Sequence, residues 1–507
     1  MDYDLIHASA VLGLRLVYKP AQVSTKSHHI SSLPASYYAV MWSLGLHILF
    51  CVGLLRAGSP GLAYMLPDST DLLRRAAPRL SARDNITLQP IHLEDVGNAV
   101  YTVNITVAGN TIPVAVTTST SDLWLFSLEA TGINDTSLAA EVNYGGSLVS
   151  GTVSFADVAL GQYTSVSQGM LSASSPLGFA DTVMTAFLRV DNAVNMTVLF
   201  NLGIYGMLGL GLEDASVIRN IMLAKGYSSA SSRTLPSNIF NDNPDISPFA
   251  SMILGRTADQ QISVNGNLTF GSYLPPFDVN QAEHLPVYTN YTSYNTSGTA
   301  DPPTWLIAVD GIMGQNGSYT LNSSVPGMPS GKSLAVLEGF EGDSQVGDDV
   351  VNFIYSQFPG AVYYSPGGIW IVPCNASSNV AFNFGGQQIP INPLDLTVIG
   401  TQELSGALVT FCRNAFRSFT HQSPRFSSHD MILGSSFLRN VYTLFVYGDA
   451  SNSTGATGDP YVQFLPTTNQ TSASASFLDS REATLKSLPP ELTPAEFVHR
   501  LQEHGGG

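Results

Sequence analysis

The feature that most constrains the fold of this chain is a succession of short β-branched segments divided by glycine and asparagine turns. Segments of this kind, which alternate in polarity or are rich in Val, Ile and Thr, are found at 99–107, 111–118, 151–160 and 261–271. A similar series begins at residue 304, and the apolar-apolar-glycine run at 207–209 returns 225 residues later at 432–434. The pattern predicts an all-β protein built from two similar halves.

The composition agrees with a β-rich protein of more than one folding unit. The chain has 507 residues, of which 44% are apolar and only 12% charged, with 45 glycines and 29 prolines. Helices are expected only as short elements, at 214–226 and 348–358. The net charge of −17 argues against nucleic-acid or anionic-membrane partners, because both require a basic surface.

The N-terminal region contains a segment typical of a secretion signal. Residues 37–55 are apolar and almost uncharged, and the small residues that follow suit cleavage after Ala63. The signal peptide is therefore predicted at 41–63, and residues 1–40, which precede the expected start at Met41, are interpreted as an extension of the gene model. If residues 1–40 belong to the protein, 37–55 is long enough to act as a signal anchor instead. Secretion, with no membrane span in the mature protein, is the preferred interpretation.

Two further features are typical of a secreted protein. Twelve Asn-X-Ser/Thr sequons are candidate glycosylation sites, at Asn85, Asn104, Asn134, Asn195, Asn267, Asn290, Asn295, Asn316, Asn322, Asn375, Asn452 and Asn469. Once Cys51 leaves with the signal, Cys374 and Cys412 remain as an even pair, most simply one disulfide. A metal site is the poorer interpretation, because two cysteines without clustered histidines supply too few ligands. No metal or other cofactor is expected.

Eight stretches carry a resemblance that none of them would establish alone: TTSTSDLW (117–124), YGGSLVSG (144–151), YGMLGLG (205–211), LTFGSY (268–273), AVLEGFEGDSQVGDDVVNFIYSQFPGAVY (335–363), IWIVPCN (369–375), VAFNFGG (380–386) and MILGSSFLRNVYTLF (431–445). In their order and spacing they resemble the pepsin-like aspartic peptidases in their secreted fungal form. The resemblance covers about residues 95–465 and implies two β-rich lobes with a long cleft between them.

The resemblance divides the chain into segments. It implies an N-terminal lobe at 95–275 and a C-terminal lobe at 276–465, preceded by an N-terminal segment at 64–94. Residues 466–507 are expected to be a flexible tail, in which 490–504 has the pattern of one amphipathic helix. The cysteine pair fits the disulfide of the family's second lobe.

The same resemblance places two substitutions where the family keeps its catalytic acids. Members hydrolyse peptides with two aspartates that share one proton, since two carboxyls about 3 Å apart cannot both ionise. Here those positions hold Thr117 and Glu338, the first loop's glycine is Ser119, and the second loop continues with GFE at 339–341. A hydroxyl cannot act as the base, and one carboxyl cannot fill both roles. No catalytic pair is therefore intact.

Other positions of the cleft are retained. Thr118 matches the hydroxyl that ties the two loops together, although its second-lobe counterpart is missing, so that the tie is at best half made. Trp124, Tyr144 and Gly145 match the cleft tryptophan and the flap, with a core role for the two aromatic residues as the alternative. Asp122 lies in the turn after the first loop and is rejected as a substitute catalytic acid.

An acidic run follows the second loop and has two interpretations. It consists of Glu338, Glu341, Asp343, Asp348 and Asp349. The run could hold Ca²⁺, but its spacing fits no EF-hand loop, and a solvated loop is the preferred interpretation.

Three functions remain open at this stage. The first is a secreted, catalytically inactive pseudo-peptidase, monomeric, whose cleft binds a peptide, a protein segment or an inhibitor. The second is an acid endopeptidase that uses Thr117 and Glu338 as an unusual pair. The third is a structural extracellular glycoprotein with no ligand in the cleft.

Overall fold

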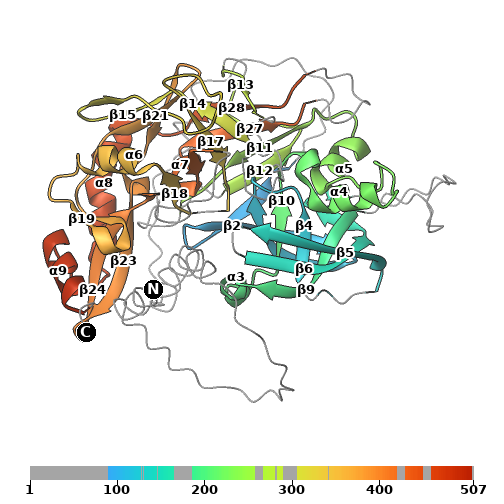
Figure 1. Cartoon of the computed structure of the whole chain (residues 1–507), viewed down its shortest axis with the longest axis horizontal. Coiled ribbons are helices and arrows are strands. Elements are labelled where there is room, and N and C mark those ends of the chain that lie inside the picture. The colour runs from blue at the N-terminus through green and yellow to red at the C-terminus, as the bar shows by residue number, and fades with distance from the viewer. Residues whose placement is uncertain are drawn as a thin grey trace.

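The structure, a computed structural model, describes residues 89–126, 128, 131–144, 147–164, 185–256, 266–279, 282–288, 305–340, 342–418, 429–448 and 458–504. Figure 1 shows two strand-rich halves, the N-terminal half in blue to green on the right and the C-terminal half in yellow to red on the left. The all-β, bilobal fold with short helices is confirmed. The predicted extension, signal peptide and signal anchor lie outside the described residues.

The N-terminal half is formed by β1 (Ile91–Val96), β2 (Val100–Val107), β3 (Asn110–Thr117), β4 (Leu123–Phe126), β5 (Asn134–Tyr144), β6 (Ser147–Ala156), β7 (Val158–Leu160), β8 (Tyr163–Thr164), β9 (Thr185–Val194), β10 (Gly206–Gly209), β11 (Phe249–Ile253) and β12 (Gly266–Phe270). Its helices are α3 (Thr197–Asn201), α4 (Val217–Ala224) and α5 (Leu235–Asp242). The helix predicted at 214–226 is thus present as α4.

The C-terminal half contains β13 (Leu285–Pro286), β14 (Leu306–Val309), β15 (Gly311–Gly314), β16 (Gly317–Tyr319), β17 (Ser333–Leu337), β18 (Ser344–Val346), β19 (Val362–Tyr364), β20 (Ile369–Val372), β21 (Val380–Phe384), β22 (Gln387–Ile391), β23 (Thr397–Leu404), β24 (Ala407–Asn414), β25 (Phe416–Ser418), β26 (Met431–Leu433), β27 (Val441–Val446) and β28 (Tyr461–Pro466). Its helices are α6 (Asp348–Tyr355), α7 (Ser435–Leu438), α8 (Gln470–Leu485) and α9 (Pro494–His504). The helix predicted at 348–358 is α6.

The same arrangement of three strands occurs once in each half. In the first, β10 pairs in parallel with β3 and antiparallel with β4, which places Gly209 opposite Thr117. In the second, β26 pairs in parallel with β17 and antiparallel with β18, which places Leu433 opposite Leu337. The apolar-apolar-glycine echo in the sequence therefore marks equivalent strands, each supporting the strand that leads into a candidate active loop.

The two halves are joined through a shared sheet and a shared core. β27 of the C-terminal half pairs with β11 of the N-terminal half, as the neighbouring labels in Figure 1 show. One sheet therefore continues in the order β28-β27-β11-β12-β1. The buried side chains of Trp305 and Tyr447 cross this boundary and donate hydrogen bonds to the Leu210 carbonyl, at 3.0 and 2.8 Å. These contacts fix the loops of one half relative to those of the other.

The expected flexible tail at 466–507 is corrected by the structure, in which two helices of this segment pack on the C-terminal half. Asn469 caps α8 by accepting a hydrogen bond from the Ser472 amide at 3.1 Å. The helix then buries one stripe spaced four residues apart, formed by Ala473, Phe477 and Arg481. The predicted amphipathic helix at 490–504 is present as α9, and it packs Phe497 and Leu501 into a buried cluster.

The predicted disulfide joins Cys374, just after β20, to Cys412 in β24, with the two Cα atoms 5.2 Å apart. The segment between α8 and α9 lies against the same strands. Thr410 of β24 holds this segment in place, because its amide and its hydroxyl donate hydrogen bonds to the carbonyls of Pro490 and Pro489, at 2.9 and 2.7 Å. None of the helices in the described residues is both long and apolar enough to cross a membrane.

Candidate active site

The two candidate loops meet because each follows a strand of the repeated unit. Thr117 ends β3, and the Leu210 amide donates to its carbonyl at 2.8 Å. Glu338 directly follows β17, and its amide donates to the Leu433 carbonyl at 3.0 Å. Residues 221 positions apart in the chain are thereby brought within hydrogen-bond distance.

The carboxyl group of Glu338 spans the boundary between the halves. Its Oε1 accepts hydrogen bonds from Thr117 Oγ1 at 2.9 Å and from the Phe340 amide at 2.8 Å. Its Oε2 is bonded to Ser119 Oγ. The carboxyl is therefore held by two hydroxyl groups of the first loop and one amide of its own loop. Sequence reasoning treated Ser119 only as a lost glycine and missed its role as a partner of Glu338.

The surroundings of Glu338 favour its neutral form. Its side chain is almost fully buried, and burial raises the pKa of its carboxyl, although the bonds from Ser119, Phe340 and Thr117 oppose the rise. All of these bonds are donated to the carboxyl: Oε1 accepts from Thr117 and from the Phe340 amide, and Oε2 accepts from Ser119 Oγ. The carboxyl can act as a weak acid, but nothing beside it in the described residues offers a second carboxylate.

Thr118 supplies one half of the tie between the loops. Its hydroxyl donates to the Leu337 carbonyl at 2.7 Å and accepts from the Gly339 amide at 3.0 Å. Gly339 has no side chain with which to return these bonds to the first loop. Through these two bonds Thr118 connects the first loop to the backbone on both sides of Glu338.

The other acids near the loops are engaged elsewhere. Asp122 is buried and accepts hydrogen bonds from Ser216 Oγ and from the Val217 amide at 2.9 Å, which caps the start of α4. Asp343, far from being a solvated residue, is buried and paired with Arg413 at 2.6 Å. Within the described part of the acidic run, Asp348 and Asp349 bond separately to Ser418 and Tyr319, respectively. Glu341 lies outside the described residues.

The aromatic positions of the cleft are only partly described. Trp124 is fully buried in a cluster of the N-terminal half that also contains Val142 and Val149 of the β5–β6 hairpin, which agrees with the core alternative. The backbone of Tyr144 ends β5. Its side chain and the whole of Gly145 lie outside the described residues, so the flap assignment stays a prediction.

A buried ionic cluster, which sequence reasoning missed, lies at another point of the boundary. Asp395 Oδ1 accepts from Arg256 Nε at 3.1 Å and from Arg439 Nε at 2.8 Å, and its Oδ2 accepts from Asn440 at 3.0 Å. Arg439 also donates to the Asn98 carbonyl at 2.9 Å. The cluster thus binds both halves through one carboxylate. Its members are too far apart in the chain for spacing to reveal them.

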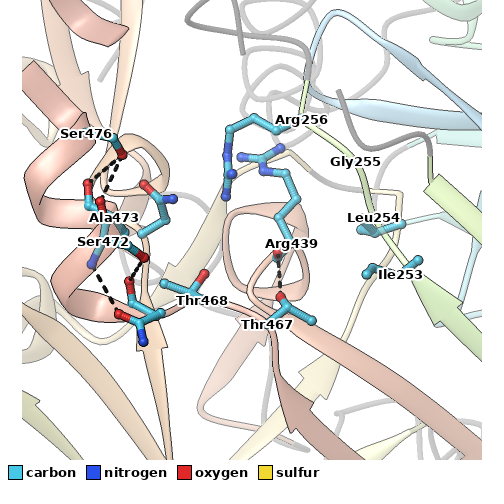
Figure 2. A pocket seen from close by; sticks show the side chains of 12 residues that line it. Ile253, Leu254, Gly255, Arg256, Arg439, Thr467, Thr468, Ser472, Ala473 and Ser476 are labelled. Atoms are coloured by element: carbon cyan, nitrogen blue, oxygen red, sulfur yellow. Dashed lines mark hydrogen bonds between the residues drawn. The ribbon is translucent and has the colours of Figure 1, made fainter. Parts of the chain in front are cut away.

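A pocket of about 400 Å³ lies beside this cluster and not at the candidate loops. Figure 2 shows Arg256 and Arg439 close together, with α8 on one side and Ile253 and Leu254 on the other. Neither Thr117 nor Glu338 lines it. Both guanidinium groups that line the pocket are already bonded to Asp395, and the pocket takes no part in the chemistry of the candidate loops.

Replacing Glu338 with glutamine tests the state of this carboxyl. A carboxyl whose pKa is raised in the folded protein adds stability that is complete below its ordinary value of 4.5 and is lost as the pH rises through the folded-state value. Since glutamine mimics the neutral acid, we expect Glu338→Gln to raise the free energy of unfolding by about 1 kcal/mol at about pH 8 and to change it little at about pH 3.

Urea denaturation at both pH values measures this difference. The exposed Glu403→Gln is the matched control and should show no comparable change. If Glu338→Gln were instead less stable at the higher pH, the carboxyl would be ionised in the folded protein and stabilised by its hydroxyl partners.

Comparison with known proteins gives an assignment consistent with this geometry. The eukaryotic aspartyl protease family matches residues 100–456, which is more than half of the chain. The chain is 24% identical over 299 residues to major aspartyl peptidase 1 of Cryptococcus neoformans, covering 56% of this chain and 55% of that protein. It is 25% identical over 372 residues to a probable aspartic-type endopeptidase of Aspergillus fumigatus, covering 69% and 77%.

The chain thus spans about half the length of the Cryptococcus peptidase, and α8 and α9 lie beyond the part that the family matches. Three observations agree with one another: the two loops pair across the halves, the three-strand unit is repeated, and the family match covers both halves. This chain belongs to the eukaryotic aspartyl protease family.

Proposed function

We propose that this protein is a non-hydrolysing member of its family, a pseudo-peptidase whose cleft binds peptides or peptide-like inhibitors. The observation that carries the proposal is the bonding of Glu338. Its two carboxyl oxygens are taken by Thr117, Ser119 and the Phe340 amide, all of them groups of the protein itself.

The chemistry of the family requires a base and an acid at the same time. A carboxylate must remove a proton from water while a neighbouring carboxylic acid polarises the scissile carbonyl. Here the partner at 2.9 Å is the hydroxyl of Thr117, which has no accessible negative charge. Glu338 therefore has no second acid with which to divide the two roles.

A second candidate is an acid endopeptidase with a Thr117–Glu338 pair. It is favoured by the names of the relatives, which are a peptidase and a probable endopeptidase, and by the raised pKa of Glu338, a property shared by many catalytic acids. A third candidate is a structural extracellular glycoprotein whose cleft is empty.

Two measurements on the natural protein separate these functions. Digestion of casein between about pH 3 and 5, with and without pepstatin, should give no cleavage. Calorimetry with pepstatin and with a peptide mixture should detect binding. Cleavage that is lost in Glu338→Gln would establish the second candidate in place of the first, and absence of both cleavage and binding would leave the third.

We also propose that the protein is secreted and glycosylated. Supporting this are the disulfide and the sequons whose asparagines are exposed in the described residues, namely Asn104, Asn134, Asn316, Asn322, Asn375 and Asn469. Protein recovered from culture medium should gain electrophoretic mobility after enzymatic removal of N-glycans. Retention inside the cell with unchanged mobility would contradict secretion.

A further inference from the structure

Phe340 crosses from the C-terminal half into the N-terminal half. The buried cluster around Trp124 is formed by residues between Ala99 and Met222, all from the N-terminal half. Half-buried apolar side chains pack around it, and among the described residues Phe340 is the one contributed by the other half. A large ring from the second candidate loop therefore lies on the apolar surface of the first half.

The backbone on both sides of this ring is held in place. The Phe340 amide donates to Glu338 Oε1 at 2.8 Å, and the Gly342 carbonyl accepts from the Ser436 amide at 2.9 Å. Gly342 also lies against Ala99, where an added Cβ would come within 3.1 Å of its Cα. The segment that carries the ring is thus fixed at one end to the candidate site and packed at the other against the first half.

The position of the Phe340 ring limits where a ligand side chain can bind. It follows Glu338 by two residues, and the cluster it covers includes Val142 and Val149 of the β5–β6 hairpin. Because the Phe340 amide is bonded to Glu338, a ligand side chain placed on this apolar surface from the candidate loops would have to take the position of the ring. An aromatic side chain on this surface is already supplied by the protein.

We infer that Phe340 acts as an internal occupant of the cleft and determines which ligand side chains the cleft accepts. Its ring excludes a bulky apolar side chain from the surface of the Trp124 cluster. Removing the ring creates a binding site for an aromatic side chain. The role of Phe340 in peptide selection rests on the proposed function, whereas the masking of the surface does not.

The test uses a probe with one aromatic ring, N-acetyl-phenylalanine amide, titrated by NMR into the full chain. Phe340→Ala should bind it at least about tenfold more tightly than the natural protein does, since burying a ring gains more free energy than a tenfold change in affinity requires. The gain should be absent with N-acetyl-alanine amide, which has the same backbone without the ring.

Phe200→Ala is the matched control, because Phe200 is another half-buried phenylalanine packed on the same cluster, but from α3 of the first half. An equal gain in that variant, or no gain in Phe340→Ala, would overturn the inference. If Phe340→Ala does not fold, Phe340→Val retains a branched side chain and should show a gain of about threefold, and no gain there would overturn the inference equally.

The titration of the Phe340 variants can be judged separately from the test of the proposed function. If the natural protein fails to bind pepstatin or peptides, the proposed function is contradicted. The titration with N-acetyl-phenylalanine amide still decides whether Phe340 masks the apolar surface. Binding of peptides by the natural protein, together with no gain in the Phe340 variants, contradicts the inference alone.

Discussion

Restoring both candidate loops should raise casein cleavage at acid pH by at least about a thousandfold over the natural chain, which is the scale of effect seen when acid–base groups are removed from enzymes. The change comprises Thr117→Asp, Ser119→Gly, Glu338→Asp, Gly339→Ser, Phe340→Gly and Glu341→Thr. The physical reason is that the frame for the two acids is present. β3 and β17 are supported by equivalent parallel strands, and Thr118 already connects the loops.

The restored chain is compared with one that carries the same set but Thr117→Asn in place of Thr117→Asp. Asparagine has nearly the shape of aspartate but cannot share a proton as an acid, so this control should stay inactive and the activity of the restored chain should be inhibited by pepstatin. Activity in the asparagine control, or cleavage by the natural chain that Glu338→Gln abolishes, would show that the paired acids are not what this architecture requires.

Removing the carboxylate of Asp395 should lower the free energy of unfolding by about 3–5 kcal/mol, because it leaves two guanidinium groups without their buried partner. The Asp395 side chain is fully buried, and those of Arg439 and Arg256 are 4% and 15% exposed. Urea denaturation of Asp395→Ala at neutral pH measures the loss. The control is Asp135→Ala, whose partner Arg189 is 2.9 Å away at an exposed site and whose loss should cost at most about 1 kcal/mol.

The stability lost in Asp395→Ala has a defined pH dependence. Burial alone would raise the pKa of Asp395, but the charges of Arg256 and Arg439 outweigh it and hold the pKa below its ordinary value of 3.8. The stability that the carboxylate adds is therefore present above that value and is lost as the pH falls through the folded-state value. The difference between the natural protein and Asp395→Ala should narrow only in strong acid. A deficit that disappears already near neutral pH would contradict the assignment.

Much of the fold could be predicted because its signals are local. The alternation at 99–107 and 111–118 appears as β2 and β3, and the glycine-ended runs at 207–209 and 432–434 mark the repeated strands. The tail was predicted wrongly, because α8 is rich in serine and threonine and has little overall amphipathic character. Its buried stripe of Ala473, Phe477 and Arg481 becomes recognisable only when the helix is known to face the C-terminal half.

The amino-acid sequence by itself determined which chemical groups this protein can use: a hydroxyl at 117, one carboxyl at 338 and no Asp-Thr-Gly loop, all of them properties of single residues. Only the tertiary structure decided what those groups do. Glu338 meets Thr117 and Ser119 across 221 and 219 residues, and Phe340 reaches a cluster of the opposite half. Such contacts depend on the packing of two lobes around a shared sheet, and no local pattern of residues records where that packing places a side chain.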